Sequence, residues 1–172
     1  MMSYNALRIA IMVALVALAS YIVGFYTTGL FHGATAGIGG LWSAISGIVV
    51  LQATRHAAWS SASLRVLGTA IGSIISAAYL TVLPFSPYGM AASIFATVLL
   101  CHVVRIPDHA RLASITVAVI MVTASLNPTI TPILNAALRF SESCIGTALA
   151  VFAVLLWPGE KAPLNTDQTL LR

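Results

Sequence analysis

The sequence predicts an all-α, polytopic membrane protein with six transmembrane helices. Of its 172 residues, 59% are hydrophobic and only 7% are charged, whereas a soluble domain carries about 25% charged residues. The mean hydropathy of +0.99 agrees with that interpretation. The net charge of +4 comes from residues that are spread along the chain and do not form a block, so no nucleic-acid partner is expected.

Six apolar stretches approach the ~20 residues that a bilayer requires of a helix. They cover about residues 5–25, 34–52, 61–83, 88–104, 109–126 and 131–157, and glycine, proline and polar residues separate them. The first stretch starts like a signal peptide, but its apolar run continues past the small residues at 17–19, so we expect a retained helix. We therefore expect one membrane domain over residues 1–160 and a short cytoplasmic tail over residues 161–172.

The basic residues indicate how the chain is oriented. They fall at the start of the first stretch, beside alternate connections and after the last stretch, at Arg8, Arg55, Arg65, Arg105, Arg111, Lys161 and Arg172. The other three connections carry no Lys or Arg, so both termini are expected in the cytoplasm. Only Arg139 departs from this pattern, because it lies inside the last apolar stretch.

A pattern in the third stretch returns 74 positions later in the sixth. The two copies are Arg65-x3-Thr69-x-Ile71-Gly72-Ser73 and Arg139-x3-Ser143-x-Ile145-Gly146-Thr147. With the orientation above, they predict two inverted three-helix repeats, over about 5–83 and 88–157. Many secondary transporters are built this way and bind substrate near the membrane midplane.

Arg139 and Glu142 are the first candidates for a functional site. They are three positions apart and therefore share a helix face. Because a charge inside the bilayer is costly, both must face protein or water. They are either a structural pair or an anion-binding arginine beside a titratable carboxylate. In the second case the anion and Glu142 would compete for Arg139, which would suit proton coupling.

The remaining candidates are less specific. Arg65 either binds the anion at the cytoplasmic mouth of the transport pathway, as Arg139 would at the outer mouth, or extends to the lipid headgroups. Trp42 is either an interfacial anchor or a flat surface for an aromatic substrate. Gln52 and Thr54 complete the predicted substrate-binding set, and the small residues Gly68, Gly72 and Gly146 predict close helix packing. No nucleophile triad, phosphate loop or metal motif occurs in the sequence, so an enzyme, a cofactor and a metal are not expected.

Three motifs together resemble the FUSC superfamily, which contains fusaric acid resistance and aromatic acid exporter proteins of bacteria and, as relatives, plant aluminium-activated malate channels. The motifs are Trp42-x-x-Ile45-Ser46-x-x-Val49-Val50-Leu51-Gln52-x-Thr54, Leu64-Arg65-Val66-Leu67-Gly68-Thr69-x-x-Gly72 and Arg139-Phe140-x-Glu142-x-x-Ile145-Gly146. The resemblance spans about residues 5–158. It implies a six-helix unit of the bacterial inner membrane that handles organic anions, with a proton gradient and in some members a periplasmic adaptor. Arginines line the pore of the malate channels, which the resemblance matches here to Arg65 and Arg139.

The expected function is therefore the export of small, in particular aromatic, organic acid anions. The alternatives are an organic-anion channel of the malate type and a non-transporting membrane subunit of a larger complex. Many relatives carry a cytoplasmic domain or a second six-helix half after this unit, whereas this sequence ends twelve residues past Glu160. A homodimer is the expected substitute for the second half.

Overall fold

The computed structural model describes residues 4–52 and 54–156. This part of the chain folds into six α-helices and two short 3-10 helices: α1 (Tyr4–Phe31), η1 (Gly33–Thr35), α2 (Ala36–Val50), α3 (Arg55–Val82), α4 (Pro87–Val103), η2 (Pro107–His109), α5 (Ala110–Leu126) and α6 (Pro132–Leu156). Five spans are long and apolar enough to cross a membrane, while α4 has 17 residues. The prediction of an all-helical membrane protein is confirmed at this level. The expected tail at 161–172 lies outside the described residues.

Two helices are longer than the sequence predicts. The Thr54 side chain accepts a hydrogen bond from the Ala57 backbone N–H at 3.2 Å, and this cap starts α3 at Arg55, six residues earlier than expected. Helix α1 continues to Phe31, six residues further than expected. As a result Arg65 lies ten residues, or ~15 Å, inside α3, whereas the predicted stretch places it close to the N-terminal end of the helix.

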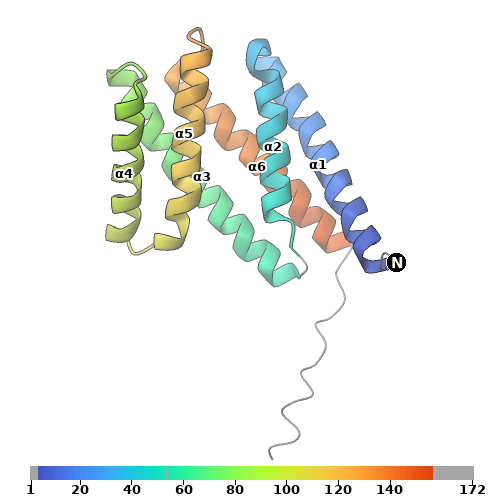
Figure 1. The fold of residues 1–172 in the computed structure, drawn as a ribbon. Helices are drawn as coiled ribbons and strands as arrows, with labels where there is room; N and C mark the ends of the chain where they lie inside the picture. The colour runs from blue at the N-terminus through green and yellow to red at the C-terminus, as the bar shows by residue number, and fades with distance from the viewer. Residues whose placement is uncertain (1–3, 53, 157–172) are drawn as a thin grey trace, which may run out of the picture.

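The two central helices, α3 and α6, are inclined and cross between two pairs of neighbours (Figure 1). Helices α1 and α2 lie on one side and α4 and α5 on the other. Successive helices alternate in direction, so the α2–α3 and α4–α5 connections lie at the same end as the start of α1. A helix of 28 residues such as α3 is ~42 Å long, and a span longer than the ~30 Å hydrocarbon layer is accommodated by tilting.

The two halves of the chain follow the same order of elements. η1 and η2 begin 74 positions apart, α2 and α5 begin 74 apart, and α3 and α6 end 74 apart. Their packing partners correspond as well, because α3 packs against α5 while α6 packs against α2. Each central helix therefore packs mainly on a helix of the other half and on the other central helix.

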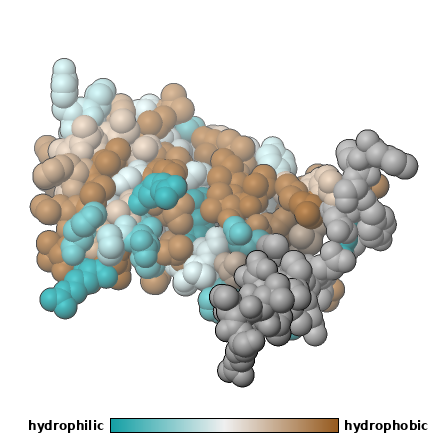
Figure 2. Space-filling view, turned by 60° about the horizontal axis from the view of Figure 1, so that its bottom comes forward, coloured by the Kyte–Doolittle hydropathy of each residue, from teal (hydrophilic) through white to brown (hydrophobic). Residues whose placement is uncertain are grey.

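The interior of the bundle contains many buried polar residues besides its apolar core, and its flanks are apolar. Fully buried hydroxyl groups lie at the centre, among them Ser43, Ser46, Thr69 and Ser143, while large apolar side chains such as Leu30 on α1 are exposed. Hydrophobic residues cover most of the helix flanks, and hydrophilic residues gather toward the end with the α2–α3 and α4–α5 connections (Figure 2). Polar contacts between helices are common in membranes, where apolar burial does not drive helix association.

Candidate substrate-binding site

The site is built around the crossing of α3 and α6. Thr69 Oγ1 and Ser143 Oγ lie 3.0 Å apart at the crossing. Arg65 and Arg139 each precede these residues by four positions, on helices that run in opposite directions. The two arginine positions therefore lie on opposite sides of the crossing, each ~6 Å from it along its helix.

Glycines allow α6 to approach α2 closely and α3 to approach α5 closely. A Cβ at Gly146 would collide with the Ser43 carbonyl of α2, and one at Gly72 would lie 2.7 Å from Thr116 Cβ of α5. A Cβ at Gly68 would lie 2.9 Å from Leu112 Cβ. All three positions thus require glycine for close packing.

Arg139 and Glu142 form a fully buried ion pair on α6. Arg139 Nη2 lies 2.8 Å from Glu142 Oε1, and their side chains are 0% and 1% exposed. Thr28 Oγ1 of α1 also donates to Glu142 Oε1, at 2.6 Å. Gly39 of α2 leaves room for the carboxylate, because a Cβ there would lie 2.7 Å from the same oxygen. Helices α6 and α1 therefore bind this carboxylate, and α2 packs closely against it.

Several buried polar atoms around the pair have no hydrogen-bond partner among the described residues. They are Arg139 Nε and Nη1, Glu142 Oε2, Asn135 Oδ1 and Trp42 Nε1. Buried polar groups are normally hydrogen-bonded, and exceptions need an explanation. Donors and acceptors left free in one cluster are what a small polar ligand could satisfy.

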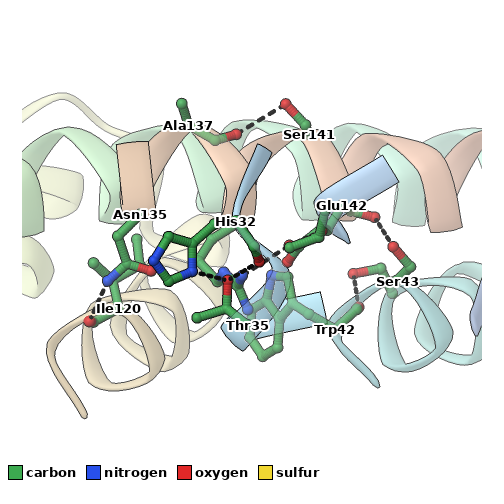
Figure 3. A network of polar contacts seen from close by, with 12 residues as sticks. His32, Thr35, Trp42, Ser43, Ile120, Asn135, Ala137, Ser141 and Glu142 are labelled. Carbon is green, nitrogen blue, oxygen red and sulfur yellow. Dashed lines mark hydrogen bonds and ion pairs between the residues drawn. The ribbon is translucent and has the colours of Figure 1, made fainter. Parts of the chain in front are cut away.

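One edge of the cluster is formed by the turn between α1 and α2. His32 Nδ1 and Thr35 Oγ1 lie 3.2 Å apart, and Figure 3 draws both in one view with Glu142 and Asn135 of α6. His32 is only partly buried, whereas Thr35 is fully buried. This turn therefore separates the ion pair from the end of the bundle.

Arg65 has a different set of partners. Its Nε and Nη2 donate to Ser46 Oγ at 3.1 and 2.8 Å, and its Cζ lies 4.5 Å from the centroid of the Trp42 ring. Arg65 is 1% and Trp42 4% exposed. Extension of Arg65 to the lipid headgroups and an interfacial Trp42 are both excluded, because the two side chains form a buried cation–π pair.

The structure does not bring the whole predicted set together. Gln52 and Thr54 are exposed in the α2–α3 connection, where Gln52 donates to the Val49 carbonyl and Thr54 caps α3. Sequence reasoning also missed Thr28 and Asn135. The one available signal was that Asn135 lies four positions before Arg139 and hence on its helix face.

Comparison with known proteins gives one match. The model of the fusaric acid resistance protein-like family matches residues 15–153, which is most of the chain. No curated protein and no solved structure matches this chain. The matched region runs from α1 to α6 and includes Arg65, Arg139 and Glu142. The chain is therefore a multi-pass membrane protein that belongs to the fusaric acid resistance protein-like family.

Proposed function

We propose that the protein is a secondary transporter that exports small organic acid anions, in particular aromatic ones. Membership of the family supports a function in transport across a membrane. The observation that carries the proposal is the fully buried Arg139, whose Nε and Nη1 have no hydrogen-bond partner among the described residues. A guanidinium group can bind a carboxylate through two parallel N–H···O bonds, and a low-dielectric site strengthens them.

Glu142 provides the proposed link to protons. Its carboxylate lies on Arg139 at 2.8 Å and so acts as a tethered anion at the same guanidinium group. A substrate carboxylate competes with it, and protonation of Glu142 removes the competitor. This competition couples the binding of a substrate anion at Arg139 to the protonation of Glu142. Because Arg139 and Glu142 are 0% and 1% exposed, the closed site favours a carrier over an open channel.

The proposed mechanism uses two inverted repeats and alternating access. The 74-residue correspondence of the elements and the contact between the equivalent residues Thr69 and Ser143 support an axis at the crossing of α3 and α6. Arg8, Arg55 and Arg105 belong to the end that carries the α2–α3 and α4–α5 connections. The positive-inside rule assigns that end to the cytoplasm, in keeping with the proposed location in the bacterial inner membrane.

We also propose a homodimer that forms along a groove between α3 and α6. The groove comprises cavities of about 580 and 330 Å³. Residues of α3 that line one cavity lie 74 positions before residues of α6 that line the other. Ala62 in the larger cavity corresponds in this way to Ala136 in the smaller one, and Ser73 in the smaller cavity corresponds to Thr147 in the larger one. Small residues of this kind allow helices of two copies to approach closely, and exposed large side chains on the same faces, such as Trp59 and Ile133, add apolar surface for the contact.

Uptake of radiolabelled benzoate into proteoliposomes tests the function. We expect saturable uptake that responds to an imposed pH gradient, and its loss in Arg139→Gln. Arg55→Gln is the matched control, because Arg55 is exposed and its Nη2 donates to the Leu155 carbonyl at the far end of α6. Currents far above carrier turnover would support the channel instead. No transport in either assay would refute both and favour a non-transporting subunit.

In a Glu142→Gln protein the proposal predicts uptake that no longer responds to the pH gradient, because the amide cannot exchange the coupled proton. Measurement of benzoate uptake at equal and at unequal internal and external pH separates uptake driven by the benzoate gradient from uptake driven by the pH gradient. Uptake by this variant that stays dependent on the gradient would refute the role of Glu142.

A further inference from the structure

The side-chain amide of Asn135 has a fixed orientation. It is 0% exposed, and its Nδ2 donates to the Ile120 carbonyl of α5 at 2.9 Å. The reversed amide would place two acceptors, Oδ1 and the Ile120 oxygen, against each other. The hydrogen bond therefore assigns the two amide atoms, and Oδ1 points away from Ile120. That oxygen has no hydrogen-bond partner in the described part of the chain.

Asn135 Oδ1 belongs to the same cluster as the free donors of Arg139. Asn135 lies one turn before Arg139 on α6, and side chains at this spacing are neighbours on one helix face. In Figure 3 the Asn135 amide extends from α6 toward the side on which His32 and Glu142 lie. The site thus combines free N–H donors with an acceptor that is held in place by α5.

The two kinds of atom require different things of a ligand. A carboxylate satisfies Arg139 Nε and Nη1, but it has no hydrogen for Asn135 Oδ1. A buried acceptor that stays unpaired destabilises the complex, whereas a hydroxyl or N–H group on the ligand satisfies it. Resting on the proposed function, we infer that Asn135 determines specificity and selects organic acids that carry a hydrogen-bond donor besides the carboxylate.

Two neighbours of Asn135 are less suited to this role. Glu142 Oε2 is also an unpaired acceptor, but a carboxyl group can carry its own proton and then acts as a donor. The ring nitrogens of His32 accept or donate according to the tautomer, and Nδ1 already contacts Thr35. The amide oxygen of Asn135 has neither alternative, so it is an acceptor in every state of the site.

Binding of benzoate and of its 2-, 3- and 4-hydroxy derivatives tests the inference. For the wild-type protein in detergent, the best hydroxylated isomer should bind about tenfold more tightly than benzoate, as one hydrogen bond to a buried acceptor predicts. In Asn135→Leu the ratio should fall to about twofold or less. Asn127→Leu is the matched control, because this partly buried asparagine lies at the end of α5 and donates to the Thr123 carbonyl; it should keep the wild-type ratio.

The ratio of two affinities within one variant does not depend on how much of the sample is folded. Asn135→Ala removes the same acceptor with a smaller side chain and should give the same loss if the leucine variant does not fold. Equal affinity of wild-type protein for all four acids, or a preference that survives in both variants, would overturn the inference and leave the transport proposal intact. No binding of any acid would refute the proposed function as well.

Discussion

Neutralising Glu142 tests how the buried charge pair is held. Glu142→Gln keeps the shape of the side chain and an acceptor for Thr28, but leaves the Arg139 guanidinium group, 0% exposed, without a counter-charge. At 2.8 Å between Nη2 and Oε1, two unit charges attract by about 6 kcal/mol with an effective dielectric constant of ~20. Desolvation offsets part of that attraction, and removal of one partner of a buried pair lowers the free energy of unfolding by about 3–5 kcal/mol.

The double variant separates pairing from shape. Arg139→Gln alone should cost about as much as Glu142→Gln, while the two together should lie within about 2 kcal/mol of wild type, because no uncompensated charge remains. Unfolding by sodium dodecyl sulfate from mixed micelles, followed by circular dichroism, gives the three values. Asp108→Asn in the exposed η2 turn is the control and should change stability by no more than about 0.5 kcal/mol. Strictly additive effects of the two single changes would refute the pair as the reason for the loss.

Three further changes test the packing. Gly146→Leu should prevent folding, seen as loss of the monodisperse peak in size-exclusion chromatography, while Gly37→Leu should not, because a Cβ at Gly37 would have no atom within 4 Å. Trp42→Leu removes the ring 4.5 Å from the Arg65 guanidinium and should lower the unfolding free energy by about 2 kcal/mol or more; unchanged stability would contradict the cation–π contact. Thr54→Ala removes the cap of α3 and should cost about 1 kcal/mol, with benzoate affinity unchanged in a titration.

The sequence was sufficient to predict the number of helices, but it predicted their ends less accurately. Six apolar stretches separated by proline and glycine predicted six helices, and all six form in the described residues. The predicted start of the third helix at about residue 61 is too late, because the Thr54 cap starts α3 at Arg55. That error also placed Arg65 near a helix end, whereas it lies ~15 Å inside α3.

The site could be predicted only where its contacts are local. The Arg139–Glu142 pair is an i, i+3 contact, so helical spacing revealed it. The Thr28–Glu142 hydrogen bond joins residues 114 positions apart, and the bond from Asn135 to Ile120 joins two helices. Such contacts depend on how the helices pack, and no local pattern in one sequence specifies that packing.

Each central helix, α3 or α6, packs on a helix of the other half of the chain, and this arrangement has a consequence for biogenesis. Because α6 packs against α1 and α2, and α3 against α5, each of the first three helices leaves the ribosome before its packing partner in the second half exists. Separate fragments cut between Val82 and Pro87 should be unstable when synthesised singly and should accumulate when synthesised together. The last helix to enter the membrane thus completes the fold of the first two.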